Sequence, residues 1–249
     1  MKIIVCMKQV PAGTNVEIDP ETGAMKRMSG ETRTNPYDLF ALETALLLKE
    51  KMGGTVTVLT MGPAQAEEMM RDAYTMGADE AVILSDRKFA GADVLATSYA
   101  LKQGIEVIGG ADLILCGRQT TDGDTAQVGP AIAEHMGIPH AAWVSEIVNV
   151  REDAICVKQD LASVTQVSEL PFPCLITVDK DICVPRLPSY RLMRETEERP
   201  VRILSFKDMP DQDTKTGVSG RERRRENRAA VFSSDRRENY LEENQIWIF

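Results

Sequence analysis

The sequence lacks the residue patterns of several common kinds of site. Its 249 residues contain two histidines, His135 and His140, and neither stands at ligand spacing from a cluster of cysteine, aspartate or glutamate. No metal site is therefore expected. None of the five cysteines is paired as CxxC. Free buried thiols in a reducing cytoplasm are the simplest interpretation of these cysteines.

Long apolar runs are also missing. A membrane-spanning helix needs about 20 consecutive apolar residues, and no run approaches that length. The opening stretch "MKIIVCMKQVP" becomes polar too quickly for a secretory signal. We therefore expect a cytoplasmic protein without membrane insertion.

Positive charge is in deficit, since the formal net charge is -9. Binding to nucleic acid needs clustered Lys and Arg against the phosphates, so a nucleic-acid partner is not expected. The exception is "RERRRENR" at 221–228, where Glu222 and Glu226 interrupt the basic run. The interruption favours a solvated helix or tail.

Recognised catalytic and phosphate-binding signatures are absent as well. The chain contains neither GxGxxG nor GxxxxGK[ST], and no Ser-His-Asp or Cys-His pairing is suggested by position. Cys6 and Cys116 end predicted strands, where a small buried residue is a better interpretation than a nucleophile. No catalytic residue is predicted.

Alternating strand and helix patterns fill the first 140 residues. β-branched, apolar segments predict strands at 2–10, 55–62, 80–85 and 113–116. Between them, apolar spacing and Gly stops predict helices at 36–52, 63–77, 93–109 and 125–137, the first with Asn35 as N-cap. This alternation predicts an α/β fold, with a Rossmann-like parallel sheet and helices on both faces.

The pattern of apolar and polar residues changes after Pro139. Alternating apolar residues predict a β-hairpin with its turn near Glu152 and Asp153, and "CLITV" at 174–178 predicts a central strand. From Cys183 onwards, prolines interrupt any long element, so an extended arm lying on another surface is expected. We therefore divide the chain into a nucleotide-binding domain at 1–182 and a partner-binding arm and tail at 183–249.

The stretch "LILCGRQTTDGDTAQVGPAIAEHMG" at 113–137 is the most informative. In open parallel sheets, ligands sit beyond the carboxyl ends of the strands. A helix starting near 125 leaves the N–H groups of 124–128 free for a phosphate, and Gly117, Gly123 and Gly129 would allow close approach. Asp122 could accept a hydrogen bond from a ribose or an adenine amino group, or cap the helix. A capped loop without a ligand is the alternative.

Five motifs in order resemble the β subunit of electron transfer flavoproteins. They are "VCMKQVP", "NPYDLFALE", "GGTVTVLTMGPAQAEE", "MGADEAVILSDRKFAGADVLATS" and "LILCGRQTTDGDTAQVGPAIAEHMGIP". The resemblance covers about residues 1–207. It implies a Rossmann-like domain paired with a larger, FAD-containing α subunit, and a nucleotide held by the β subunit.

The loops that the family uses for this nucleotide coincide with those at the predicted carboxyl edge. The candidate cofactor-binding residues are Cys6, Asn35, Pro36, Asp38, Met61, Gly62, Phe89, Ala90, Gly91, Asp93, Thr97, Cys116, Gly117, Arg118, Gln119, Thr120, Asp122, Gly123, Asp124, Thr125, Ala126, Gln127, Val128 and Gly129.

The nucleotide is either FAD, as in bifurcating members, or AMP, as in simple carriers. "DGDTAQVGP" and "SDRKFAGADVLATS" resemble the bifurcating branch and favour FAD, while "NPYDLFALE" resembles the branch linked to nitrogen fixation. That branch implies NADH as hydride donor, with ferredoxin or flavodoxin and a partner dehydrogenase as acceptors. The AMP alternative implies a single-flavin carrier that serves an acyl-CoA-type dehydrogenase. A signalling or stress protein of the same fold is a third possibility, which the long arm argues against.

The sequence departs from the family in two places. "VPRLPSYRLMRE" aligns with the partner-recognition loop, but "RETEERPVRI" replaces the usual lysine-rich stretch. The tail at 220–249 also departs from the short family ending. Its apolar "IWIF" favours contact with a partner.

Overall fold

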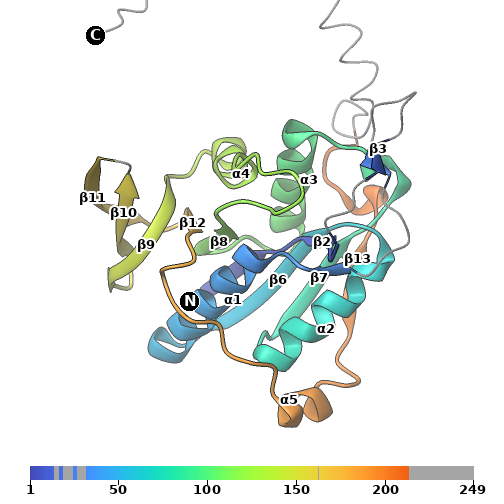
Figure 1. The fold of residues 1–249 in the computed structure, drawn as a ribbon, viewed down its shortest axis with the longest axis horizontal. Coiled ribbons are helices and arrows are strands. Elements are labelled where there is room, and N and C mark those ends of the chain that lie inside the picture. The colour runs from blue at the N-terminus through green and yellow to red at the C-terminus, as the bar shows by residue number, and fades with distance from the viewer. Residues whose placement is uncertain (14–16, 19–24, 27–31, 162, 213–249) are drawn as a thin grey trace, which may run out of the picture.

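The computed structural model describes residues 1–13, 17–18, 25–26, 32–161 and 163–212. A single large sheet organises the chain, with helices on both of its faces (Figure 1). The tail at 220–249, including the basic run and "IWIF", lies outside the described residues.

The sheet has nine strands in the order β11-β10-β9-β12-β8-β1-β6-β7-β13. They are β1 (Lys2–Cys6), β6 (Thr55–Met61), β7 (Glu80–Leu84), β8 (Leu113–Gly117), β9 (His140–Val150), β10 (Ala154–Leu161), β11 (Val164–Pro171), β12 (Cys174–Val178) and β13 (Val201–Leu204). In this order, every neighbouring pair from β9 across the sheet to β13 is parallel. Strand β10 pairs antiparallel with both β9 and β11. The predicted hairpin is confirmed, with β11 as a further strand.

The remaining elements are short strands and helices. They are β2 (Gln9–Pro11), β3 (Glu17–Ile18), β4 (Met25–Lys26), β5 (Thr32–Thr34), α1 (Pro36–Met52), η1 (Ala64–Ala66), α2 (Glu67–Met76), η2 (Arg87–Phe89), α3 (Val94–Val107), α4 (Val128–Met136), α5 (Tyr190–Glu195) and η3 (Phe206–Asp208). The strand predicted at 2–10 is divided in two. It breaks at Lys8, whose N–H leaves the sheet and donates to Asp38 Oδ2.

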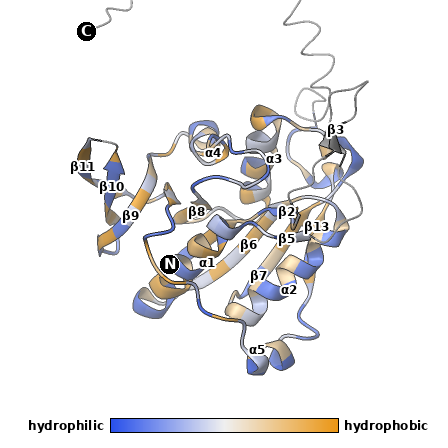
Figure 2. Cartoon of the chain, viewed as in Figure 1, coloured by the Kyte–Doolittle hydropathy of each residue, from blue (hydrophilic) through white to orange (hydrophobic). Residues whose placement is uncertain are grey.

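Two apolar cores lie on opposite faces of the sheet. Ile3 and Val5 of β1 belong to the core shared with α1 and α2, while Ile4 belongs to the core shared with α3 and α4. This division follows from the two-residue period of a strand. In Figure 2, hydrophobic colour follows the strands and the helix faces turned towards them. No helix in the described parts of the chain is long and apolar enough to cross a membrane.

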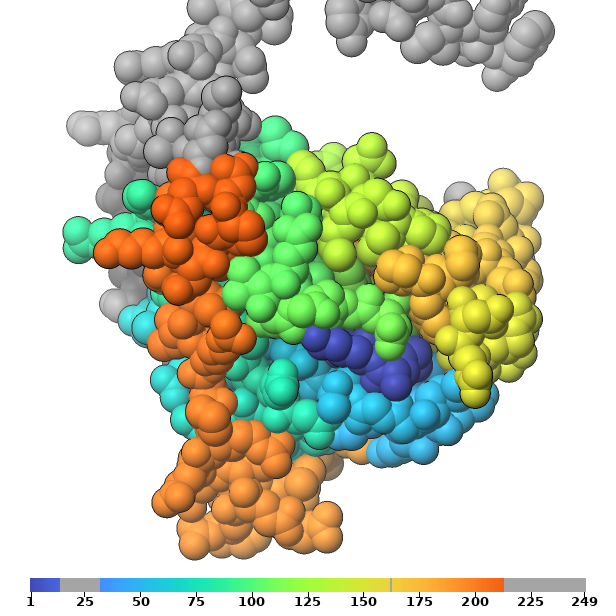
Figure 3. Space-filling model, turned by 180° about the vertical axis from the view of Figure 1, so that it is seen from behind, coloured from blue at the N-terminus to red at the C-terminus, as the bar shows by residue number. Residues whose placement is uncertain are grey.

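The segment after Cys183 is more closely integrated than an extended arm. It crosses the α1 and α2 face and then contributes β13, which pairs in parallel with β7 at the edge of the sheet (Figure 1). The space-filling view shows its orange residues packed along one side of the molecule (Figure 3). The sheet therefore continues beyond the boundary that we placed at 182 and 183.

Side chains from the helices fasten this segment. The Arg186 guanidinium bonds both carboxylate oxygens of Glu43 at 2.8 and 2.9 Å and reaches Glu50 at 2.8 Å. The hydroxyl of Tyr74 donates to Pro200 O at 2.6 Å. These contacts attach the segment to α1 and α2 although only part of it is buried.

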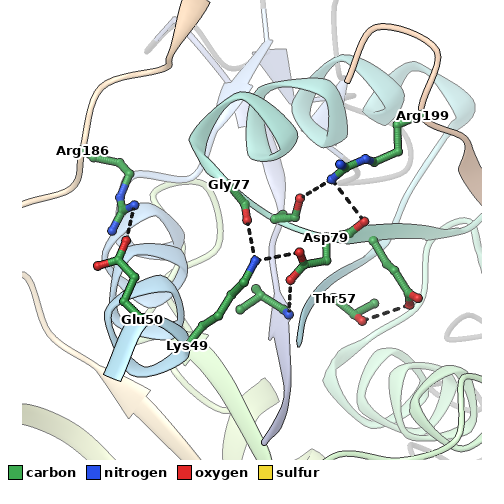
Figure 4. A network of polar contacts seen from close by, with 10 residues as sticks. Lys49, Glu50, Thr57, Gly77, Asp79, Arg186 and Arg199 are labelled. Atoms are coloured by element: carbon green, nitrogen blue, oxygen red, sulfur yellow. Dashed lines mark hydrogen bonds and ion pairs between the residues drawn. The ribbon is translucent and has the colours of Figure 1, made fainter. Parts of the chain in front are cut away.

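A second group of polar contacts lies at the start of β7 (Figure 4). Lys49 Nζ lies 2.6 Å from Asp79 Oδ1, and Asp79 Oδ2 accepts from Val56 N at 2.8 Å. Arg199 Nη1 donates to Ala78 O at 3.0 Å. The turn before β7 is thereby joined to α1, β6 and the C-terminal segment.

Candidate functional site

The carboxyl ends of the parallel strands form one edge of the sheet. Cys6, the last residue of β1, is in register with Cys116 of β8 and with Leu59 of β6. Met61 ends β6 at the same edge, and Gly62 N donates to Leu84 O at 3.1 Å. Candidate residues from three strands, β1, β6 and β8, thus share this edge, as expected for an open α/β sheet.

Asn35 and Asp38 form the buried centre of the site. Asp38 accepts from Lys8 N at 2.7 Å and from Asn35 Nδ2 at 2.9 Å. Asn35 Nδ2 also donates to Gln119 O at 2.8 Å, and its Oδ1 accepts from Thr121 N at 3.2 Å. One buried amide therefore joins the start of α1 to the loop after β8.

The prediction of Asn35 as the N-cap of α1 is confirmed, although its side chain makes no capping hydrogen bond. Pro36 follows it and has no N–H to satisfy. The amide is therefore available for the loop, which offers a carbonyl oxygen and an N–H together.

Burial dominates the ionisation of Asp38. Removal from water raises the pKa of this carboxyl group to about 7, against the opposing effect of its hydrogen bonds from Asn35, Lys8 and Gly117. Near neutral pH, the neutral and charged forms of this carboxyl group are therefore both populated.

Lys8 and Asp122 connect the loop after β1 to the loop after β8. Lys8 Nζ lies 2.7 and 2.8 Å from the two oxygens of Asp122, whose side chain is 8% exposed. Burial acts to raise the pKa of Asp122, but the hydrogen bond and charge of Lys8 outweigh it, so the pKa lies below its ordinary value. Asp122 is therefore an ion-pair partner and does not cap α4.

The loop after β8 runs on to residue 127, and α4 begins at Val128 rather than near 125. Asp124 and Ala126 have φ of 50° and 54°, which is incompatible with a continuous helix. Pro130 lies within the first turn of α4. Among the described residues, no hydrogen bond is found for the N–H groups of Thr125 to Gly129. Several donors at a helix N-terminus therefore remain available to an anion.

The three loop glycines serve different purposes. A Cβ on Gly117 would lie 2.4 Å from Asp38 Oδ1, and one on Gly129 would lie 2.6 Å from Thr177 Cγ2. These two glycines therefore allow α1 and α4 to pack against the sheet, and their assignment to ligand approach stays a prediction. Among the described residues, Gly123 has only Thr120 Oγ1 nearby, at 3.6 Å, which is compatible with the same assignment.

Arg118 is held between two neighbouring strands. Its Nη1 lies 2.6 Å from Asp179 Oδ2, and its guanidinium carbon lies 4.6 Å from the ring centre of Trp143. Its Nε is buried and has no hydrogen-bond partner within the described part of the chain. A buried donor without an acceptor is unfavourable by about 1–3 kcal/mol, so Arg118 fits a site completed by an acceptor from outside the chain.

The loop at 85–93 contacts the C-terminal segment. Asp86 Oδ2 accepts from Phe206 N at 3.1 Å, and the rings of Phe89 and Phe206 lie 6.0 Å apart. Asp93 caps α3 by accepting from Ala96 N at 2.9 Å. Ala90 and Gly91 lie on the exposed stretch between these two anchors, and Thr97 lies in the first turns of α3.

Sequence reasoning placed Lys8 after the first strand, at the predicted carboxyl edge, but did not list it among the binding residues. It did not assign Trp143 or Asp179 to the site. Asp179 likewise follows the predicted strand 174–178 directly. Trp143 gave no such signal, because its position depends on a φ of 61° inside β9.

The arrangement is suited to binding rather than to nucleophilic chemistry. The neighbouring Cys6 thiol, together with burial, raises the pKa of Cys116 well above its ordinary value, which disfavours a thiolate. In the described residues no group of three or more His, Cys, Asp or Glu side chains is placed to hold a metal ion.

Comparison with known proteins agrees with this architecture. Residues 22–209 match the family model described as the electron transfer flavoprotein domain. The chain is 43% identical to the electron transfer flavoprotein subunit beta of Thermoanaerobacterium thermosaccharolyticum, over 88% of this chain and 84% of that protein. It is 44% identical to the caffeyl-CoA reductase-Etf complex subunit CarD of Acetobacterium woodii, over 84% of this chain and 80% of that protein. Protein FixA of Sinorhizobium fredii is 47% identical to the chain, over 72% of this chain and 65% of that protein.

Proposed function

The chain belongs to the electron transfer flavoprotein family, among its β subunits, and on that basis we propose that it holds FAD at the carboxyl edge of its sheet and takes part in electron bifurcation. The family implies flavin-related electron transfer and an α-subunit partner. The observation that carries the proposal is the convergence of Lys8 and Asn35, both bonded to Asp38, on the loop 118–127.

The residues at this edge fit a nucleotide. The free N–H groups at the start of α4 and the unpaired Nε of Arg118 suit the oxygens of a pyrophosphate. Gln127 is exposed at the same helix start and offers a side-chain amide. Because Lys8 already neutralises Asp122, that carboxylate would serve by fixing the loop rather than by repelling the phosphates.

The chain's own residues position and shield, while the cofactor supplies the redox chemistry. A bound FAD would accept hydride from NADH and divide the electrons between ferredoxin or flavodoxin and, through the α-subunit FAD, a partner dehydrogenase. Asn35 would keep the loop 119–121 against α1, so that the open donors stay in place. Buried Cys6 and Cys116 would form an apolar floor beneath them.

FAD is favoured over AMP by sequence similarity within the family. The stretches 85–98 and 122–130 resemble bifurcating members, and two relatives carry the printed names CarD, from a caffeyl-CoA reductase-Etf complex, and FixA. The candidate residues Phe89 to Thr97 would border the flavin and an NADH pocket. The alternative is a subunit that holds AMP and supports transfer through a single flavin.

The C-terminal segment supports a protein partner. Four apolar side chains on it are strongly exposed: Val184 at 89%, Leu187 at 86%, Tyr190 at 74% and Met193 at 46%. They lie in the segment that resembles the family's partner-recognition loop. We assign them to contact with a partner dehydrogenase, whose identity the replaced lysine-rich stretch leaves open.

Cofactor content tests the proposal. The chain is produced together with its α subunit, the complex is denatured, and the FAD and AMP released per heterodimer are quantified. Two FAD and no AMP are expected, and NADH-dependent ferredoxin reduction is then assayed. One FAD with one AMP would replace bifurcation by the AMP alternative, and no nucleotide beyond that of the α subunit would overturn the site.

A matched pair of variants tests the location. Asp122→Ala removes the buried partner of Lys8 and should lower the nucleotide retained by this chain several-fold. Asp153→Ala removes an exposed carboxylate in the β9–β10 turn, 81% exposed, and should leave retention unchanged. Equal retention in both variants would contradict the assignment of the loop.

A further inference from the structure

Trp143 has a backbone conformation that is rare within a strand. Its φ is 61°, in the left-handed region, although it is not a glycine. The β9–β12 register is irregular at this point, between Ile176 and Val178. The N–H of Trp143 donates instead to Thr177 Oγ1 at 3.0 Å, and Thr177 is 2% exposed. Such irregularities redirect side chains, and they gather near functional sites.

The redirected indole meets Arg118, which begins the candidate nucleotide loop. Arg118 N donates to Val178 O at 2.9 Å, so the residue is fixed at the end of β8. Its guanidinium lies over the Trp143 ring at 4.6 Å, a separation typical of cation–π contacts. The indole itself remains 38% exposed.

Asp179 also holds the guanidinium of Arg118 in place. One carboxylate oxygen accepts from Arg118 Nη1 at 2.6 Å, and the other accepts from Lys180 N at 2.7 Å. Asp179 N donates to Val144 O at 2.9 Å, which anchors the backbone beside Trp143. Arg118 and Asp179 directly follow the ends of β8 and β12, and Trp143 lies within the adjacent strand β9.

Among the described residues, one buried nitrogen of the Arg118 guanidinium has no partner. Arg118 Nε is buried without a partner, although Nη1 is paired and the ring face of the guanidinium is stacked. Structures seldom leave a buried N–H group unpaired, so an acceptor from a second molecule is the natural completion. Arginine in a fixed plane is well suited to phosphate oxygens.

We infer that Trp143 and Asp179 are positioning residues that orient Arg118, so that its Nε donates to a phosphate oxygen of the nucleotide bound at the loop 118–129. The inference rests on the proposed function. It adds two residues outside the loop and assigns each an effect that passes through Arg118.

The test uses the heterodimer freed of nucleotide and titrated with AMP and with adenosine. Arg118→Lys keeps the charge but loses Nε and the planar group, so AMP affinity should fall about 10-fold or more, whereas adenosine affinity should stay within about two-fold. Trp143→Leu and Asp179→Asn should each weaken AMP binding about three-fold or more. Arg151→Lys, in the exposed pair with Glu169, is the matched control and should change neither affinity.

The effects of Trp143 and Asp179 on AMP affinity should require Arg118 if they act through it. A merely structural role would not show this dependence. In an Arg118→Ala background, Trp143→Leu and Asp179→Asn should cause no further loss of AMP affinity. Additive losses would overturn the inference, as would unchanged AMP affinity in Arg118→Lys. Weaker heterodimer assembly with unchanged AMP affinity would also overturn it, by assigning the acceptor to the α subunit. Wild-type heterodimer that binds neither AMP nor FAD would instead refute the proposed function.

Discussion

The loop after β8 and the segment after Cys183 both cross the surface, but they use their side chains in opposite ways. The loop makes partly buried polar contacts, such as Gln119 O with Asn35 and Asp122 with Lys8, and leaves backbone donors open. The C-terminal segment is attached by Arg186 and exposes apolar side chains such as Leu187. Open donors suit a small anionic ligand, whereas exposed apolar groups suit a protein.

The difference also concerns tolerance to change. There is no spare volume at Gly117, where the loop leaves β8 beside α1, so even a small addition there should disturb the structure. The C-terminal segment is attached by a few ion pairs. Removing one of these pairs should therefore loosen this segment and leave the rest of the protein in place. Four changes sharpen or contradict this comparison, in order of expected effect on stability.

Gly117→Ala should have the largest effect. The added Cβ would lie 2.4 Å from Asp38 Oδ1 and 2.7 Å from Tyr37 C, so α1 or β8 must shift. Overpacking of this kind typically destabilises by about 1–3 kcal/mol, and the displaced buried carboxylate places this change at about 3 kcal/mol. Urea unfolding measures it. Gly123→Ala is the control, because its nearest neighbour is 3.6 Å away, and similar losses in both would contradict the comparison.

Glu43→Ala should cost about 2 kcal/mol, since it removes a 5%-exposed carboxylate that bonds Arg186 through both oxygens. Because the contact holds only the C-terminal segment, hydrogen exchange should rise at 184–195 and not in the loop 118–127. Glu50→Ala, which removes a 58%-exposed partner of the same arginine, should cost less than about 0.5 kcal/mol. Faster exchange in both regions would show that they are not independent.

Asp38→Asn should change how stability depends on pH. The folded-state pKa of Asp38 is raised to about 7 by burial, while the unfolded value is about 3.9. Between these values the folded protein keeps the proton and the unfolded chain releases it. The stability from Asp38 is therefore fully present below about pH 4 and is lost as the pH rises to about 7.

The variant removes this titration. Its unfolding free energy relative to wild type should therefore increase by about 1.4 kcal/mol per pH unit between pH 5 and 6. Chemical denaturation at a series of pH values measures the slope, with Asp153→Asn as an exposed control. A difference that stays constant with pH would show that Asp38 remains ionised in the folded protein.

Leu187→Ser should have the smallest effect on stability, below about 0.5 kcal/mol, because the side chain is 86% exposed. Its effect should appear in partner binding, since exposed apolar groups at the centre of an interface contribute strongly to affinity. Under the proposed function, electron transfer from the complex with the α subunit to the proposed partner dehydrogenase should slow, while cofactor content stays unchanged. Lys180→Ser, at an exposed position outside the segment, is the control; unchanged transfer in both would remove Leu187 from the interface.

The sequence by itself determined the order of strands and helices and the edge at which the candidate residues gather. The apolar strands and capped helices are local patterns, and parallel strands necessarily present their carboxyl ends together. The hairpin turn near Glu152 and Asp153 and the central strand 174–178 follow from the same kind of local pattern. Five family motifs then identified the family to which the chain belongs.

Only the tertiary structure decided which groups at that edge meet. Lys8 lies 114 residues from Asp122, and Asn35 lies 84 residues from Gln119, so no local pattern links them. The same holds for the start of α4, which left-handed Asp124 and Ala126 delay to residue 128, and for β13, which pairs with a strand formed more than 100 residues earlier. Hydrogen-bond partners far apart in the chain are chosen by packing, because burial requires each polar group to find whichever complement the fold brings near.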